Sequence, residues 1–272
     1  MTLAIGLVNP EGVVMAADSR QTYTRAGVVR IGSDSAVKVF ELTDTIVAAT
    51  AGYGFLRPQN EPMSRNIASL IEDFKLIIAA GSGVLAVATA LHAHFTNIYN
   101  QHTLHFPNEA VAPGSIAVRF IVAGYDPGSR LGVLYEVNAP GTAPQNPVWN
   151  SATNSGPSWI GQDDVAGRIF NGFDGRMLSL PLLQAANQAG TALPALGQLL
   201  YIVNWHTMTL QDAIDFVTGM IQITATIQRF ADGIVMQPGG VPGVGGPIDV
   251  VVIRPGGKVE WIARKALQVQ GR

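Results

Sequence analysis

The chain opens on MTLAIGLVNPEGVVMAADSR, residues 1–20, and this stretch decides the fold. Residues 2–8 are mostly apolar, Asn9-Pro10-Glu11-Gly12 has the proline and glycine of a type I turn, and residues 13–17 are apolar again. Strands that are apolar at every position are covered on both faces. We therefore expect an N-terminal hairpin buried on both sides, with other elements packed above and below it.

Strands and helices alternate in blocks along the rest of the chain. Strands are expected over residues 36–42, 45–51, 115–125, 131–137, 158–160, 248–253 and 258–262. Helices are expected over residues 63–78, 84–101 and 209–230, from about 162 onward, and in two pieces within 178–203. Residues 21–35 are polar and predict a loop or an exposed hairpin tip. Strand pairs that bracket helices favour an α+β class with two packed sheets and helices outside.

The composition limits the function classes. Apolar residues make up 47% and charged residues 13% of the 272 residues, against a usual charged share of about 25%. Much of the surface is therefore expected to be covered, which favours homo-oligomerisation. The net charge of −2 gives no support for nucleic-acid binding or a polybasic membrane contact. We find no internal repeat and no linker, so residues 1–272 are expected to form a single domain.

The chain also lacks signals for export or membrane insertion. It contains no cysteine, which excludes disulfides, thiolate catalysis and cysteine-ligated zinc. The N-terminus has no basic segment, and Asn9-Pro10-Glu11 interrupts its apolar run, so a signal peptide is not expected. Residues 76–95 carry a central Gly-Ser-Gly and predict two buried helices around a turn rather than a membrane span. A cytoplasmic location is the default expectation.

An ordered set of short segments resembles proteasome β-type subunits, which are N-terminal nucleophile hydrolases. The segments that carry the resemblance are Thr2, Asp18-Ser19-Arg20, Lys38, Ala51-Gly52, Trp159-Ile160-Gly161-Gln162, residues 209–214 and residues 245–253. They cover nearly the whole chain in the right order. The longer C-terminal half makes the chain look most similar to bacterial proteasome-like proteins, rather than to the core particle or the HslV type.

The resemblance implies a fold and an assembly. It implies a single β-subunit-like domain with a four-layer αββα sandwich of the N-terminal nucleophile hydrolase type. It also implies self-assembly into a homo-oligomeric ring or ring-like stack with inward-facing active sites. The implied activity is a threonine peptidase that cleaves peptides or unfolded proteins without a cofactor, with an unfoldase ATPase as a candidate partner.

The chemistry of such a site needs three parts. A threonine hydroxyl is a weak nucleophile and needs a base, which the α-amine of an N-terminal threonine can supply. The α-amine has a reference pKa of about 7.7–8.0, and a nearby cation lowers that pKa further. Once Met1 is removed, Thr2, Lys38 and Asp18 would supply nucleophile, cation and orienting carboxylate. Gly52 matches the position whose backbone N–H receives the oxyanion.

Supporting residues match the resemblance less fully. Ser19 and Arg20 are expected to support the site without a direct role. Gln162 stands where that family has a serine, and Asp232 corresponds to its late aspartate only with a shift. Two alternatives therefore stay open: a catalytically inactive ring or scaffold protein, and an amidohydrolase of the same nucleophile class acting on a small amide. Asp18 could also be an ordinary strand-end carboxylate, and Lys38 an ordinary surface charge.

Two other patterns give weaker signals. The histidines, His92, His94, His102, His105 and His206, are not spaced as a metal site, because 92 and 94 face different sides of a helix and 102 and 105 lie in a loop. The glycine run over residues 239–246 lacks the Lys-Ser/Thr of a phosphate-binding loop and follows no strand. No metal and no phosphate site is expected.

Overall fold

The N-terminal hairpin lies at the centre of a five-stranded antiparallel sheet in a computed structural model of the chain. The structure describes residues 2–25, 28–173, 175–234, 237–238 and 242–266. The sheet has the order β12-β1-β2-β15-β16. Its strands are β1 (Leu3–Asn9), β2 (Gly12–Ala17), β12 (Gly156–Gly161), β15 (Asp249–Ile253) and β16 (Val259–Ala263).

The predicted hairpin is confirmed in detail. β1 and β2 pair in antiparallel register from Ala4 opposite Ala17 to Asn9 opposite Gly12. Every residue of both strands is buried. The Asn9 side chain closes the turn, because its oxygen accepts from the backbone N–H groups of Glu11 and Gly12.

A second antiparallel sheet faces the first. Its order is β11-β10-β9-β6-β5. Its strands are β5 (Val39–Thr43), β6 (Ile46–Gly52), β9 (Val118–Tyr125), β10 (Gly132–Ala139) and β11 (Trp149–Asn150). One buried apolar cluster joins the two sheets, with Ala4, Met15, Val47, Ile121 and Val251 among its members. This shared cluster explains why β1 and β2 carry apolar residues on both faces.

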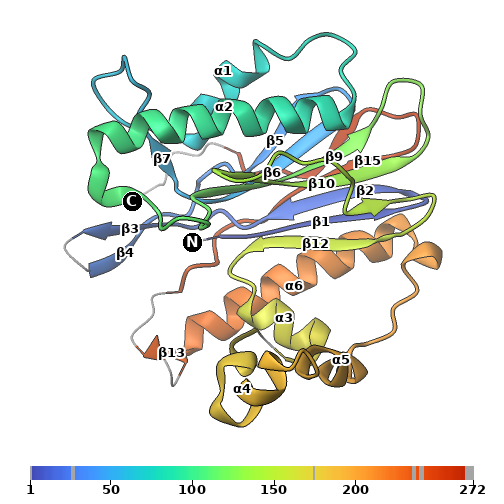
Figure 1. Cartoon of the computed structure of the whole chain (residues 1–272). Helices are drawn as coiled ribbons and strands as arrows, with labels where there is room; N and C mark the ends of the chain where they lie inside the picture. The colour runs from blue at the N-terminus through green and yellow to red at the C-terminus, as the bar shows by residue number, and fades with distance from the viewer. Residues whose placement is uncertain (1, 26–27, 174, 235–236, 239–241, 267–272) are drawn as a thin grey trace, which may run out of the picture.

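Helices pack against the outer faces of the two sheets (Figure 1). On one side α1 (Ile67–Lys75) and α2 (Val84–His105) share a cluster with β6, β9 and β10. On the other side α3 (Asp164–Asn171) and α6 (Leu210–Phe230) share a cluster with β1, β2 and β15. The predicted cap of α6 is confirmed, since Thr209 and Asp212 form a capping box. The first helix starts later than predicted because the Asn66 side chain caps it at Ser69 N–H.

Smaller elements lie outside the two sheets. Three two-stranded sheets are formed by β3 (Gln21–Arg25) with β4 (Val28–Ser33), β7 (Phe55–Leu56) with β8 (Arg65–Asn66), and β13 (Gly233–Ile234) with β14 (Gln237–Pro238). The β3–β4 pair confirms the hairpin expected within residues 21–35. Helix α4 (Pro181–Gln188) and helix α5 (Ala192–Leu196) are the two pieces expected within residues 178–203. Short 3₁₀ turns are Pro107–Glu109, Gly175–Ser179, Gly197–Leu199 and Trp205–Thr207.

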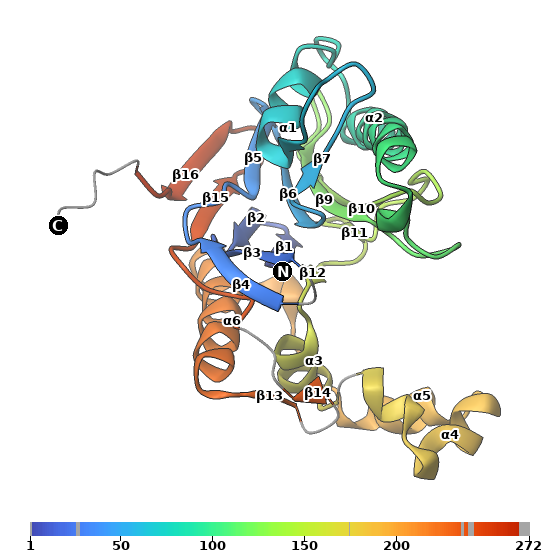
Figure 2. The ribbon, with the colours of Figure 1, turned by 90° about the vertical axis from the view of Figure 1, so that its left-hand side faces the viewer.

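The expectation of a four-layer αββα sandwich of the N-terminal nucleophile hydrolase type was wrong for the chain as described. The structure is rich in sheet, with two five-stranded antiparallel sheets, three two-stranded sheets and six α-helices among the described residues. Helices α4 and α5 stand away from both large sheets (Figure 2). They expose apolar side chains such as Leu182 and Leu193 instead of burying them. A segment that buries little apolar area on a sheet cannot serve as a packing layer.

Among the described residues, no helix combines the length and the apolar character that crossing a membrane requires.

Candidate functional site

Asp18 is a buried carboxylate placed at the end of β2. The hairpin register brings it opposite the start of β1, where its Oδ1 accepts the backbone N–H of Leu3 at 3.0 Å. Its Oδ2 accepts the backbone N–H groups of Arg20 and Gly245, each at 3.0 Å. The Asp18 side chain has no exposed surface. Three backbone donors and a lysine therefore fix the orientation of this carboxylate.

Lys38 completes an ion pair with Asp18. Its Nζ donates to Asp18 Oδ1 at 2.9 Å and to the backbone carbonyl of Arg20. The Lys38 side chain is only 6% exposed, so the interpretation of Lys38 as a surface charge is wrong. Burial lowers the pKa of Lys38, because an ammonium loses hydration there, while the nearby Asp18 carboxylate opposes that shift.

Thr2 lies beside this pair, just before β1. Its backbone carbonyl accepts the N–H of Gln162 at 2.6 Å. Gly161, which is paired with Leu3, adopts a φ of +102°. A Cβ at Gly161 would lie 1.9 Å from the Thr2 carbonyl oxygen, so only glycine allows this approach of β12 to the N-terminus. Met1, whose removal the predicted chemistry requires, lies outside the described residues.

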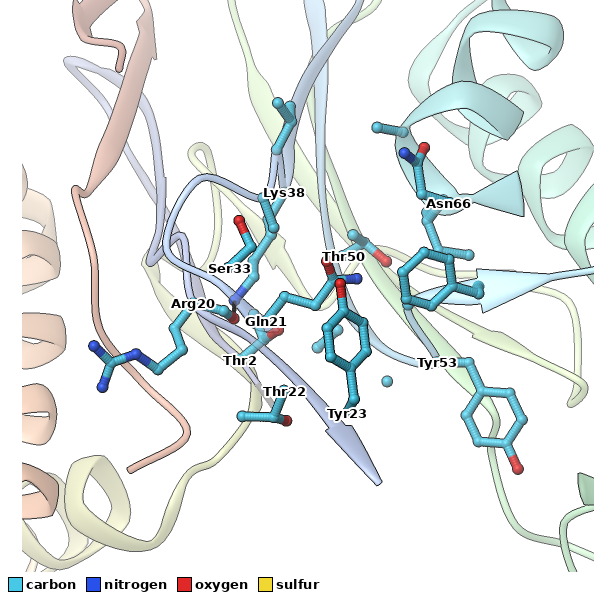
Figure 3. Close-up of a pocket in the computed structure, with 18 of the residues that line it drawn as sticks. Thr2, Arg20, Gln21, Thr22, Tyr23, Ser33, Lys38, Thr50, Tyr53 and Asn66 are labelled. Carbon is cyan, nitrogen blue, oxygen red and sulfur yellow. Dashed lines mark hydrogen bonds between the residues drawn. The ribbon is translucent and has the colours of Figure 1, made fainter. Parts of the chain in front are cut away.

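A pocket of about 390 Å³ opens at Thr2 (Figure 3). Thr2, Lys38 and Gly52 all line it. Gly52 ends β6 with a φ of +107°, and a Cβ there would lie 2.2 Å from the Ala117 carbonyl oxygen. Other parts of the wall come from β3, β4, β6, β7, β8 and the start of α1, and include Tyr23, Thr50 and Asn66 (Figure 3). Phe55 lines the pocket as well. Among the described residues that line the pocket, none carries a carboxylate.

Ser19 and Arg20 hold the loop around Asp18. Ser19 Oγ donates to the carbonyl of Pro247 at 2.7 Å. Arg20 forms a two-point ion pair with Asp34, at 2.7 and 2.8 Å. The Arg20 guanidinium fills the space where a Cβ of Gly245 would stand. Both residues therefore act as structural neighbours of the site, and Asp34 is a partner that the sequence did not identify.

Gln162 and Asp232 differ in their placement. Gln162 lies next to Thr2 through its backbone, and its side-chain Oε1 accepts from Gln228 Nε2 at 3.0 Å. Asp232 is exposed after α6, and among the described residues no hydrogen bond or ion pair joins it to Asp18, Lys38 or Thr2. The structure therefore does not bring Asp232 to the site. Gln228, in the last turn of α6, instead contacts Gln162. No short sequence motif pointed to Gln228.

Among the described residues, no histidine lines this pocket, and two of the histidines have partners elsewhere. His102 accepts from the Arg57 N–H at 3.1 Å and pairs with Glu109 at 3.1 Å. His206 contacts Ser155 Oγ at 2.7 Å. Within the described ranges, no group of three or more His, Asp or Glu side chains is arranged to hold a metal ion.

Comparison with known proteins gives a likeness in fold. No family model matches the chain, and no curated protein matches it either. Among solved structures, the chain is similar to the Anbu (Gly-1) mutant from Hyphomicrobium sp. strain MC1, with 14% sequence identity and a TM-score of 0.53. The match covers 97% of this chain and 87% of that chain. At this identity the likeness concerns the fold alone.

The assignment to the bacterial proteasome-like family made from short segments is corrected by these comparisons. Short segments such as Asp18-Ser19-Arg20 occur often by chance, and no family model recognises them here. What stands is a distant structural similarity to Anbu at the level of the fold.

Proposed function

We propose that the chain is a threonine-type amide hydrolase that cleaves peptide bonds, with Thr2 as nucleophile after loss of Met1. The observation that carries the proposal is the buried Lys38–Asp18 pair, joined at 2.9 Å, whose lysine lines the same pocket as Thr2. A buried charge pair next to an open pocket and a hydroxyl group is an arrangement typical of catalytic sites.

The proposed reaction uses these residues in turn. The Thr2 hydroxyl oxygen attacks the carbonyl carbon of the substrate, and the hydroxyl proton passes to the Thr2 α-amine, directly or through one water. The proton then moves to the departing amine, the peptide bond breaks, and water hydrolyses the acyl-enzyme. Lys38, held by Asp18, keeps the α-amine neutral by placing positive charge nearby. The Gly52 backbone N–H is the proposed donor to the oxyanion.

The substrate and the assembly follow from the surroundings of the pocket. Its lining combines Thr22, Tyr23, Thr50 and Phe55 with the cations Arg20 and Lys38, each of which has its own carboxylate partner. A pocket without a carboxylate favours uncharged substrate side chains over lysine or arginine. We further propose self-assembly into a homo-oligomer, which agrees with the 13% charged content and with exposed apolar residues such as Leu182, Tyr201 and Ile202.

The direct test replaces Thr2 with alanine. Thr2→Ala removes the nucleophilic oxygen and leaves the Lys38–Asp18 pair in place. We expect turnover of uncharged fluorogenic peptides to fall to background, while sedimentation velocity shows the same assembly as the unaltered protein. Equal turnover in the variant would exclude Thr2 as nucleophile.

An inactive scaffold protein is the second candidate. Two observations favour it: Gln162 stands beside Thr2, and Asp232 lies away from the site. A small-amide amidohydrolase remains the third. Turnover of a peptide library by the unaltered protein separates the first candidate from the other two, because neither a scaffold nor a small-amide enzyme cleaves peptides.

A further inference from the structure

Gln228 bridges two backbone segments that hold opposite sides of the site. Its Oε1 accepts the backbone N–H groups of Gly243 and Val244, at 3.0 and 2.9 Å. Its Nε2 donates to Gln162 Oε1 at 3.0 Å. The next residue of the first segment, Gly245, donates its N–H to Asp18, and Gln162 donates its own N–H to Thr2. One side chain at the end of α6 therefore connects the segment that binds Asp18 with the residue that binds Thr2.

Hydrogen-bond chemistry fixes the orientation of both amides. Backbone N–H groups can only donate, so Gly243 and Val244 require the oxygen of Gln228 on their side. The NH₂ group of Gln228 must then face Gln162, and since NH₂ can only donate, Gln162 must present its oxygen. The NH₂ group of Gln162 is consequently turned to its other side. No other assignment of the two amides satisfies all four groups.

We propose that Gln228 is a positioning residue that, through Gln162 and the 243–245 segment, holds Thr2 and Asp18 in register without adding a charge. The inference rests on the proposed function for its kinetic consequence, but the hydrogen-bonded bridge itself does not. In this arrangement two neutral amides, rather than a charged side chain, join Gln162 to the 243–245 segment.

The charged groups around the N-terminus are already balanced. Asp18 pairs with Lys38, Asp34 with Arg20, and Asp249 with Lys265. Asp164 is the first residue of α3, two positions after Gln162, and its Oδ2 lies 3.4 Å from Arg176 Nη2. Asp163 and Arg229 lie at the ends of α3 and α6. A new carboxylate at position 228 would therefore add unbalanced negative charge, which favours the protonated form of the Thr2 amine.

Two substitutions separate geometry from charge. Gln228→Met keeps the length of the side chain but loses all three hydrogen bonds. We expect kcat to fall about tenfold with KM and the pH profile unchanged.

Gln228→Glu still accepts from Gly243 and Val244 but cannot donate to Gln162. We expect the acidic limb of the kcat/KM profile to move up by about half a pH unit, because the charged amine is stabilised. Gln222→Glu, an exposed position on the same helix, is the matched control and should leave the profile in place.

A second readout does not need turnover. The pH midpoint for acylation of the N-terminal amine, followed by mass spectrometry, should rise in Gln228→Glu and stay fixed in Gln222→Glu and Gln228→Met. If the unaltered protein turns over no peptide, the proposed function fails, while this midpoint still decides the inference. A midpoint that is the same in Gln228→Glu and Gln222→Glu would overturn it, as would unchanged kcat in Gln228→Met.

Discussion

Two buried Lys–Asp pairs have their aspartates on neighbouring strands of one sheet, and the structure gives the pairs different surroundings. Lys38–Asp18 has side-chain exposures of 6% and 0%, and Lys265–Asp249 has 11% and 4%. Asp249 lies opposite Ala17 across β2 and β15, so the two carboxylates are near neighbours. Lys38 lines the pocket that contains Thr2, whereas Lys265 is absent from its lining and fastens the segment after β16 to the start of β15.

A buried ion pair is therefore not by itself evidence of a functional site. Burial of charge demands a partner wherever it occurs, because unpaired buried ions are strongly destabilising. The Lys38–Asp18 pair differs in its neighbours, because Lys38 lines an open pocket together with the Thr2 hydroxyl group. The Lys265–Asp249 pair therefore provides an internal control for the role of the first.

The largest effect should come from breaking each pair in turn. Lys38→Met and Lys265→Met each leave a buried aspartate without its cation, which costs about 3–5 kcal/mol of unfolding free energy. Thermal denaturation should therefore show similar losses. Peptide turnover should fall about 10²–10⁴-fold in Lys38→Met and stay within a few-fold in Lys265→Met at a temperature where both remain folded. Equal loss of turnover in both variants would mean that stability, and not the site, controls activity.

A smaller effect should come from the pocket, the feature that only the first pair has. Tyr23 and Phe55 stack with their ring centroids 5.8 Å apart on its wall. Phe55→Ala removes apolar contact area without touching Lys38 or Asp18. We expect kcat/KM for peptides with large apolar side chains to fall about tenfold, with little change for peptides with small ones. Phe230→Ala, at an exposed position that does not line the pocket, is a suitable control. A uniform loss across all peptides would place the substrate side chain elsewhere.

The smallest effect should reveal whether the pairs influence each other. The positive charge of Lys265 contributes to the lowered pKa of Lys38, behind the larger effect of burial. Lys265→Met removes that charge, so Lys38 should keep its proton to a higher pH. The alkaline limb of the kcat profile should therefore move up by about 0.3 pH unit. An alkaline limb that moves to lower pH would contradict this expectation. It would mean that the unpaired Asp249 carboxylate does not stabilise the Lys38 ammonium and that the surroundings of Asp249 have rearranged.

The core of the fold was predictable because its pattern is local. Residues 2–17 carry both strands and the turn of the central hairpin, and that hairpin alone places Asp18 beside Leu3. The capping box at Thr209 and Asp212 is likewise contained in four residues. The prediction that Asp18 and Lys38 pair is confirmed by their 2.9 Å contact, while their catalytic role stays a prediction.

The rest depended on contacts between distant residues. Gly245 donates to Asp18 across 227 positions, and Gln228 donates to Gln162 across 66 positions. No periodicity or short motif encodes such a meeting. Helices α4 and α5 show that local spacing predicts an element but not its position. Their apolar spacing predicted helices, but it did not predict that these helices stand away from both sheets. The resemblance carried by short segments supplied a layered architecture that this region does not follow.

The central claim is that Thr2 becomes an N-terminal nucleophile. The most direct measurement is the intact mass of the N-terminal peptide, with and without an electrophile directed at N-terminal threonine. We predict a chain that begins at Thr2 and takes up one adduct per chain at that residue, and no adduct in Thr2→Ala. A retained Met1, or an adduct that persists in Thr2→Ala, would contradict it.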